Sequence, residues 1–472
     1  MCGINVLNKI NFKNKKIFFI FFSINKMSNS IAIQQRREMK LSPDNNLPTF
    51  APVSSQNILK FTIADTQALL MTKDMRLNFK VQFFKDASRT PVALSDDINV
   101  DANTGMSSLI DQLYISSLRF NTGQSLEAIH NCGRLGASMY GALFSPKHQR
   151  SNVFMEQKSV GKASFCEEDT SKATSSDAND PFKIAQRKVL LGQEPVSLRL
   201  NSGVLMSQPA GLDLNQIGGV RLDIFLAPTI AQVLYGSDVS SSAFYEISDV
   251  SLTCPLLYKS ADQIAQDRAS PKTSLSFLNY VSIYGVIDST ISTLSHKLNF
   301  DGLVSLFSNS IQTDHINSLT NNNMACENFG SIRSLRFSKN GQRSPLEYDL
   351  VPDRETDDTP SNEQSSTYSQ IVENYLGAFK TPEDVRRTSV CNQTLIGQPS
   401  VFDGNFGIGY CLTPSTRAGI PVSGNLSMNF STKLEDSDNS DRSNQQAYGI
   451  YTYYLNRSTL ATIPNRGIVA VN

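Results

Sequence analysis

Short segments in which apolar and polar residues alternate recur along the chain, and they constrain the fold more than any other feature. In the clearest of them, RLNFKVQF at 76–83, every second residue is apolar. Side chains of a β-strand point alternately to opposite faces, so this segment offers one face to a core and one to solvent. Similar segments predict strands at 196–200, 220–226, 250–256, 275–287, 294–300, 406–410, 426–430, 448–455 and 468–471. The sequence therefore predicts a mainly β protein.

The stretch at 105–144 predicts a strand followed by a helix. The apolar residues of 113–120 change parity at Ser116-Ser117, which indicates a strand with a bulge. After a turn-forming Asn-Thr-Gly triplet, Ser125 is a suitable N-cap, and the apolar residues that follow recur at helical spacings. Three glycines in this predicted helix each cost up to ~1 kcal/mol relative to alanine, so we expect it to be short or broken.

The second half of the chain repeats this order of strand and helix. Asp301 follows a predicted strand and is a suitable cap for a short helix over 303–311. Asn340-Gly341 predicts a hairpin between two alternating segments. The clearest helix is predicted at 368–379, where the apolar residues form a single stripe. We expect this stripe to pack against the second half of the chain.

The length and the repeated order of elements predict two domains. A chain of 472 residues suits two domains of about 200 residues each, and the polar linker at 259–271 separates them. We expect the domains at 57–262 and 263–472, preceded by an extended arm at 27–56. Residues 1–26 are interpreted as an upstream extension, with translation starting at Met27. Their apolar run IFFIFFSI is too short to span a bilayer.

Two long polar segments are predicted to be exposed loops. They lie at 151–180 and 351–367, and both carry several acidic residues. Each is longer than a hairpin connection requires, so we expect both on the outer surface, where a protease would cut first.

The composition argues against strongly charged partners and against secretion. Lys+Arg and Asp+Glu both number 43, so no net field attracts nucleic acid, and we expect no direct sequence-specific nucleic-acid binding. The seven cysteines form no C-x-x-C pair, which is typical of reduced thiols in a cytosol-like compartment. We therefore interpret the four N-x-S/T sequons as unused, although a glycoprotein is the alternative. Their asparagines are Asn392, Asn425, Asn429 and Asn456.

No arrangement of residues predicts catalysis, a metal site or a bound cofactor. The four histidines, at 130, 148, 296 and 315, are not spaced as metal ligands. The glycines of GNFGIG at 404–409 alternate as in a strand, and no Lys-Ser/Thr follows them. The acidic pairs at 96–97 and 357–358 lack partners, and no G-x-S-x-G, H-E-x-x-H or Walker-type motif occurs. We expect no catalytic, cofactor-binding or metal-binding residue and therefore no enzyme.

Several phrases in order resemble the double jelly-roll major capsid proteins of polinton-like viruses. GMSSLIDQLYISSLRFNTGQSLEAIHN at 105–131 is similar to part of their first jelly roll, and GGVRLDIFLAP with YEISDVSLTCPLLY to its closing strands. LNFDGLVSLFSNS, SKNGQRSPLEYDL and FGIGYCLTPSTRAGIPVSGNLSMNF are similar to parts of the second. The resemblance extends over about residues 55 to 472.

This resemblance implies an all-β fold of two tandem eight-stranded jelly rolls with short inserted helices. It further implies a structural role in the virion, as a major capsid protein that forms homotrimers of pseudo-hexagonal outline in an icosahedral shell. The implied partners are neighbouring capsomers, a penton protein and minor capsid proteins, and no cofactor is implied. One chain does not indicate whether a membrane lies beneath the shell.

A tandem β-sandwich that binds glycans or serves in attachment is the alternative. Such a protein is expected to present clustered aromatic residues on one face. The chain has no tryptophan, and the tyrosines at 451, 453 and 454 are close enough for strand packing to explain them. The size of the protein separates the two hypotheses, because a stable trimer favours the capsid and a monomer favours the alternative.

Overall fold

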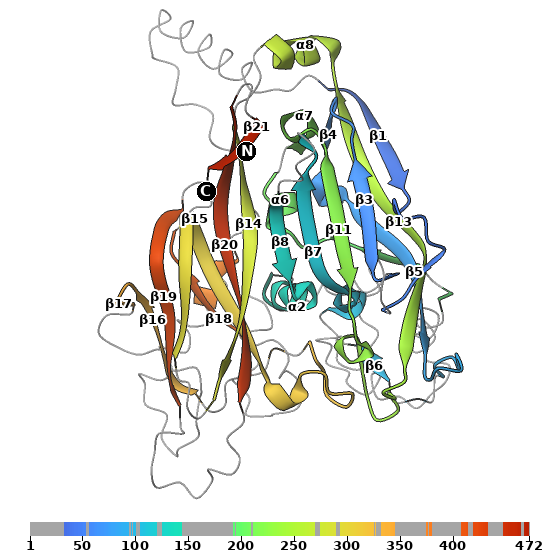
Figure 1. Cartoon of the computed structure of the whole chain (residues 1–472), viewed down its shortest axis with the longest axis vertical. Coiled ribbons are helices and arrows are strands. Elements are labelled where there is room, and N and C mark those ends of the chain that lie inside the picture. The colour runs from blue at the N-terminus through green and yellow to red at the C-terminus, as the bar shows by residue number, and fades with distance from the viewer. Residues whose placement is uncertain are drawn as a thin grey trace, which may run out of the picture.

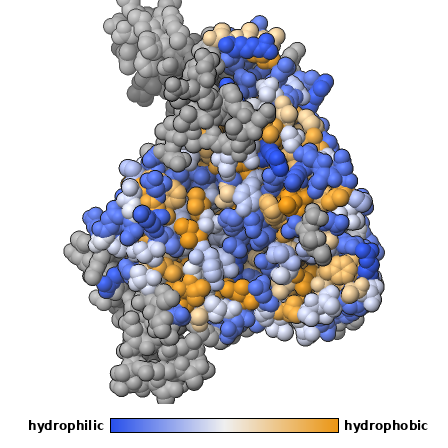
Figure 2. Space-filling view, in the orientation of Figure 1, coloured by the Kyte–Doolittle hydropathy of each residue, from blue (hydrophilic) through white to orange (hydrophobic). Residues whose placement is uncertain are grey.

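Two β-barrels stand side by side, with most of their strands running along the long axis of the molecule (Figure 1). On the face seen in Figure 2, hydrophobic residues occur over both barrels with hydrophilic residues between them. In the part of the chain that is described, no helix is long and apolar enough to cross a membrane. The computed structural model describes residues 33–52, 56–93, 96, 98–100, 104–119, 125–143, 192–193, 195–208, 211–269, 274–288, 293–324, 326, 332–344, 374–375, 377–379, 407–413, 419–432, 447–463 and 467–471.

The first barrel is built from strands joined by short helical segments. The strands are β1 (Ile33–Leu41), β2 (Thr49–Phe50), β3 (Ile58–Ile63), β4 (Ala68–Leu70), β5 (Arg76–Phe84), β6 (Asn99–Val100), β7 (Ile110–Ser117), β8 (Ser125–His130), β9 (Val196–Leu198), β10 (Leu212–Asp213), β11 (Val220–Leu226), β12 (Leu234–Tyr235) and β13 (Phe244–Lys259). The helical segments are η2 (Thr72–Asp74), η3 (Gly105–Leu109), α2 (Cys132–Leu143), α6 (Gly203–Met206), α7 (Leu214–Ile217) and η5 (Ile230–Gln232). Helix α8 (Ala261–Ala269) follows β13.

Eight strands of the first barrel form two sheets that enclose one core. One sheet has the order β1-β13-β5-β9, and the other has the order β3-β11-β7-β8. Along the chain these eight strands are β1, β3, β5, β7, β8, β9, β11 and β13. If they are numbered one to eight in that order, the first sheet has the order 1-8-3-6 and the second has the order 2-7-4-5. This is the strand order of a jelly roll. The alternation at 76–83 is confirmed, because Leu77, Phe79, Val81 and Phe83 of β5 are buried in this core.

The second barrel repeats the jelly-roll strand order, and one long strand, β15, contributes to both of its sheets. Its strands are β14 (Ser274–Ile287), β15 (Thr293–Gln312), β16 (Ile332–Lys339), β17 (Gln342–Ser344), β18 (Ile408–Cys411), β19 (Ile420–Thr432), β20 (Tyr448–Ile463) and β21 (Gly467–Val471), with η6 (Thr313–His315) after β15. The first half of β15 lies in the sheet β15-β19-β16-β17, and its second half lies in β14-β20-β15-β18. If the two halves of β15 are numbered as separate strands, the strands from β14 to β20 number eight. The two sheets then have the orders 1-8-3-6 and 2-7-4-5, as in the first barrel.

The helix predicted at 303–311 is wrong, because these residues form the second half of β15. Every residue from 302 to 311 is buried. Leu306 packs into the core of the second barrel, whereas Phe307 packs into the larger cluster on the opposite face of the sheet. A strand buried on both faces has no alternation of period two, and its apolar residues can match a helical spacing by chance.

The helix predicted to begin at Ser125 starts later, because residues 125–130 form β8 and α2 begins at Cys132. The bulge predicted at Ser116-Ser117 is wrong, because residues 113–117 pair regularly with β11; the bulge of this hairpin lies on the partner strand. Ile115 pairs with Glu127 and the next residue, Ser116, pairs with Ser125, so Leu126 is the extra residue of β8. This insertion spaces the apolar residues of β8 as a helix would space them.

Two segments predicted as irregular contain regular structure. Within the predicted arm, Ile33–Leu41 forms β1 and pairs with β13 along most of its length, so this part of the arm is a strand of the first barrel. Within the predicted linker, Ala261–Ala269 forms α8, which has no buried residue. A helix that is polar on all sides gives no apolar stripe in the sequence, which is why periodicity did not reveal it.

Two predictions for the second half are confirmed within the described residues. Asn340 and Gly341 both have positive φ, 49° and 83°, and join β16 to β17 in a two-residue hairpin. Such a turn requires both central residues in the left-handed region. Of the helix predicted at 368–379, residues 374–375 and 377–378 are helical, and Tyr375, Ala378 and Phe379 are buried.

Several predictions concern residues outside those that the structure describes. They are the upstream extension with its start at Met27, the loops at 151–180 and 351–367, and the turn at 121–123. The Met27 start remains a prediction: mass spectrometry of native protein is expected to find no peptide from residues 2 to 24.

The stability of the second barrel is expected to fall in acid through His296. Its Nδ1 lies 2.5 Å from the hydroxyl oxygen of Tyr454, and burial lowers the pKa of the imidazole from 6.5. The unfolded chain therefore binds a proton at a higher pH than the folded chain does. The stability that neutral His296 contributes is complete above pH 6.5 and decreases as the pH falls below that value. His296→Gln, followed by thermal melting across this range, should flatten the dependence. An unchanged slope would contradict the assignment.

Candidate functional site at the junction of the two barrels

One buried carboxylate lies where the two barrels meet. Glu127 of β8 is 2% exposed, and its two oxygens accept hydrogen bonds from four donors. The backbone nitrogens of Gly203 and Val204 donate from 2.9 and 3.3 Å, and the hydroxyl of Ser202 donates as well. The fourth donor is the backbone nitrogen of Tyr280 in β14, at 2.6 Å. Glu127 therefore bonds both to its own barrel and to the first strand of the second barrel.

The strands at this junction approach each other as one sheet. β8 and β14 pair in parallel through Val281 and Ala128, which joins the sheet β3-β11-β7-β8 to the second barrel. Gly203 at the start of α6 faces this seam. A Cβ atom on it would lie 2.9 Å from the Cα atom of Asn279, which is closer than real Cβ contacts come, and 3.0 Å from Oε1 of Glu127, which is tighter than most. The glycine therefore permits the close approach of the two barrels.

Burial and hydrogen bonding act on Glu127 in opposite directions. Complete burial raises the pKa of its carboxyl from 4.5 to about 7, although the four donors favour the charged form and limit the rise. In the pH interval between these two values the folded chain holds a proton that the unfolded chain has released. The contribution of Glu127 to stability is therefore complete below pH 4.5 and is lost as the pH rises through about 7.

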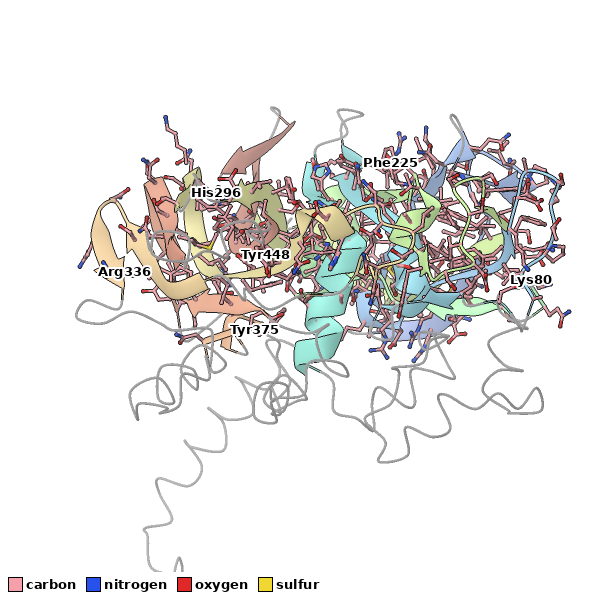
Figure 3. The ribbon with its side chains drawn as sticks, turned by 90° about the horizontal axis from the view of Figure 1, so that it is seen from below. Lys80, Phe225, His296, Arg336, Tyr375 and Tyr448 are labelled. Carbon is pink, nitrogen blue, oxygen red and sulfur yellow. The ribbon has the colours of Figure 1, made fainter. Side chains whose placement is uncertain are left out.

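Helix α2 lies between the two barrels (Figure 3). It contacts the second barrel through the polar side chains of Arg134 and Ser138. Arg134, which is 3% exposed, donates through Nη1 to Oδ1 of Asn309 at 3.2 Å and through Nη2 to the carbonyl of Asn323 at 2.6 Å. Its guanidinium lies 4.5 Å from the ring centroid of Tyr451. Nδ2 of Asn309 in turn donates to the hydroxyl of Ser138, one turn further along α2, at 2.5 Å. The buried polar groups of this helix are thus paired across the junction.

Replacing Arg134 with lysine is expected to weaken the junction by about 1–3 kcal/mol. A lysine has no planar fork that can reach both acceptors, and it cannot stack on a ring as a guanidinium does. Chemical denaturation measures the loss. Arg89→Lys is the matched control, since Arg89 is 63% exposed and pairs with Glu246 on the surface. Equal midpoints for the two variants would show that the contacts of Arg134 do not hold the barrels together.

A cluster of aromatic residues from the second barrel also packs at the junction. The ring of Phe307 lies 5.3 Å from that of Tyr453 and 4.2 Å from that of Phe379, measured between centroids. The hydroxyl of Tyr453 donates to the carbonyl of Asn131, just before α2, at 2.9 Å. Gly407, just before β18, and Gly409 within it let this cluster close: a Cβ on Gly407 would lie 2.3 Å from the ring of Tyr375, and one on Gly409 would lie 2.7 Å from the Cα atom of Tyr375. The glycines of the 404–409 phrase that are described therefore serve close packing.

A small cavity opens beside α2. Its volume is about 30 Å³, and its lining includes Asp111, Asn131, Arg134, Asn317 and Tyr451. This space is large enough for a single water molecule and too small for an organic ligand. The junction is thus closely packed, and the side chains of Glu127 and Arg134 are hydrogen-bonded within it.

Among the described residues, the candidate residues named from the sequence do not come together in one site, and His148 and the acidic pair at 357–358 lie outside the described residues. His130 is exposed at the end of β8, His296 is buried in the second barrel, and His315 lies in η6. Asp96 accepts hydrogen bonds from Lys85 and from the backbone nitrogen of Ala93. Among the described residues, no group of three or more His, Cys, Asp or Glu side chains could hold a metal ion.

The described cysteines are free thiols, whereas the described sequons differ in exposure: Asn425 of β19 is exposed and Asn456 of β20 is buried. Cys132, Cys254 and Cys326 are buried free thiols, and Cys411 is a half-buried one. Asn456 is 7% exposed within β20, so its sequon is inaccessible in the folded chain. Sequence reasoning did not predict Glu127, Arg134 or Asn309. The available signals were a glutamate within an apolar segment and an arginine among small residues.

Comparisons with known proteins identify the fold. No family model and no curated protein matches the sequence. A chain in the 3.5 Å cryo-EM structure of the Sputnik virophage matches with a TM-score of 0.53 at 13% identity, covering 93% of this chain and 89% of that one. The Faustovirus major capsid protein matches with 0.56 at 7%, covering 92% and 91%. VP54 of PBCV-1, fitted into a reconstruction of Sputnik, matches with 0.50 at 11%, covering 94% and 99%.

These likenesses extend over nearly the whole of each chain. At such low identities they establish the fold, and together with the strand orders they confirm two tandem jelly rolls in one chain. The predicted fold class is therefore correct.

Proposed function

We propose that this chain is the major capsid protein of an icosahedral virus and that it forms homotrimers of pseudo-hexagonal outline. The observation that carries the proposal is the closed junction, because Glu127 and the contacts of α2 join two jelly rolls into one body. The full-length likeness to the Faustovirus major capsid protein supports the same role. The protein would then be located in the virion shell and act as a structural component.

The geometry of a fused pair explains why such a chain suits a shell. Three copies of a two-barrel body present six similar barrels around one axis, and a body with a six-fold outline can tile a surface. The barrels must keep a fixed relative orientation for neighbouring units to match. A junction with paired buried polar groups and aromatic packing holds that orientation better than a flexible linker would. The partners would be two further copies, neighbouring capsomers, a penton protein and minor capsid proteins.

We also propose that the two domains divide at residues 262 and 263. Helix α8 lies there, between the last strand of the first jelly roll and the first strand of the second. The glycan-binding alternative finds less support. Among the described residues, Tyr284 is the large hydrophobic side chain that is exposed, at 46%, and one ring does not form an aromatic platform.

The size of the purified protein tests the proposed function. Light scattering after size-exclusion chromatography is expected to give three times the mass of one chain, and negative-stain images should show particles with a hexagonal outline. Circular dichroism of the same fractions establishes that the protein is folded. A folded protein that stays monomeric at all accessible concentrations would contradict the proposal and favour a tandem sandwich with another role.

A further inference from the structure

A buried lysine and a buried aspartate, Lys259 and Asp213, form a triad with the half-buried Asp267 at the end of the first barrel. Nζ of Lys259 lies 2.8 Å from both carboxylate oxygens of Asp213 and 2.7 Å from Oδ2 of Asp267. Their side chains are 2%, 9% and 14% exposed, in that order. Oδ1 of Asp267 also accepts a hydrogen bond from Gln263 at 3.0 Å. An amine thus lies in contact with one carboxyl group while a second carboxylate stands beside it, largely away from water.

The fold positions these groups on rigid elements. Leu69 of β4 pairs with Asp213 of β10 on one side and with Leu257 of β13 on the other. Asp213 also caps α7 by accepting from the backbone nitrogen of Asn215 at 3.1 Å, which fixes its carboxylate. Lys259 ends β13, and Asp267 reaches back to it from α8. Holding two reacting groups in contact on rigid elements favours an intramolecular reaction over one between separate molecules.

We propose that Lys259 and Asp213 condense to an intramolecular isopeptide bond, with Asp267 as the group that accepts and returns the proton. The bond forms between Nζ of the lysine and Cγ of the aspartate. One C–O bond of the Asp213 carboxyl breaks, and its oxygen leaves as water with two protons that the ammonium supplied. No oxidant, reductant or cofactor is required, because the reaction is a condensation.

The surroundings determine the order of the steps. Burial lowers the pKa of the Lys259 ammonium, but its hydrogen bonds and charge interactions with Asp213 and Asp267 outweigh burial, and the net pKa lies above its usual value. The resting triad is therefore an ion pair. Asp267 must first take a proton from the ammonium before the amine can attack, so the bond should form slowly after folding and not during it.

Removal of buried charge favours the product. The triad holds one ammonium and two carboxylates, and burial of the Lys259 and Asp213 charges is costly even when they are paired. Condensation removes these two charges and leaves the carboxylate of Asp267, whose side chain is 14% exposed. The amide is neutral, and its N–H can donate to the Asp267 carboxylate that stood beside the ammonium. Since Nζ is almost inaccessible, water that would reverse the reaction is also excluded.

The mass of the denatured full-length chain tests the proposal. Wild type is compared with Lys259→Arg, which keeps the positive charge but has no amine that can form the amide. If the bond forms, wild type is lighter than expected from the substitution alone by the mass of one water molecule. Trypsin should then fail to cut after Lys259, and a branched peptide should join it to Asp213. A mass difference equal to the substitution alone, in both fresh and aged wild-type protein, would overturn the proposal.

Two further variants assign the roles. Asp213→Ala should abolish the mass loss, and a persistent loss would show that another carboxyl group reacts. Asp267→Asn retains the shape of the side chain but removes the proton acceptor, so conversion measured over time should slow by at least tenfold. Conversion at the wild-type rate would overturn the role given to Asp267. The wild-type measurement decides whether the bond exists even if a variant fails to fold.

Discussion

Replacing Glu127 with alanine is expected to lower the free energy of unfolding by about 3–6 kcal/mol. The substitution leaves the backbone nitrogens of Gly203, Val204 and Tyr280 without an acceptor, and each buried donor left unpaired costs about 1–3 kcal/mol. Two of these donors belong to the first barrel and one belongs to the second. A loss of this size is a large part of the ~5–15 kcal/mol that typically stabilises a domain. Urea denaturation followed by circular dichroism measures it.

A graded series separates the carboxylate's role from simple loss of volume. Glu127→Gln keeps one acceptor oxygen but places an amide N–H against a donor, so we expect a loss of about 1–3 kcal/mol, between wild type and alanine. Glu38→Ala is the matched control, because Glu38 is 64% exposed and pairs with Arg36 on the surface. That variant should change stability by less than about 0.5 kcal/mol. If Glu127→Ala lost no more than Glu38→Ala, Glu127 would not hold the junction.

The same variants report on the titration of Glu127. Its pKa is raised to about 7 by burial, so wild-type stability should decrease as the pH rises from 4.5 through 7. Glu127→Gln has no proton to release and should lack this part of the slope. His296 acts in the opposite direction in acid, so the measurement is made on both the single variants and the double variant. Any dependence of stability on pH that remains in the double variant, Glu127→Gln with His296→Gln, would come from other titratable groups.

The sequence predicted strands wherever one face is buried and the other is in water. β5 and β11 are of this kind, with buried residues alternating with half-exposed ones along each strand. Local turn chemistry was equally informative at Asn340-Gly341, where the backbone requires positive φ. These features depend on neighbouring residues only, which is why one sequence is enough to predict them.

Prediction failed where tertiary packing removed the local pattern. The second half of β15 is buried on both faces, because Tyr375, Ala378 and Phe379 pack on one side of its sheet and the second barrel's core lies on the other. The extra residue Leu126 shifted the spacing in β8. The junction itself could not be predicted, since Glu127 acquires its role only when Tyr280, 153 positions later, donates to it.

Phe307→Ala is expected to cost about 3–5 kcal/mol, the usual range for removing a buried phenylalanine. The side chain is fully buried, and its ring contacts those of Tyr375, Phe379 and Tyr453. These contacts lie on the face of β15 opposite the second barrel's own core, so the packing of the described residues 374–375 and 377–379 should loosen most. Hydrogen exchange at these residues should accelerate together with the drop in the urea midpoint.

The neighbouring residue provides the control for this localisation. Leu306 is equally buried, but it packs into the second barrel's core on the other face of the same strand. Leu306→Ala should lower global stability by about 2–5 kcal/mol while leaving exchange at residues 374–379 tied to global unfolding. Phe225→Ala, at a half-exposed position of β11, should cost less than either. If Leu306→Ala and Phe307→Ala accelerated exchange at 374–379 equally, Phe307 would not be the residue that fixes this segment to the junction.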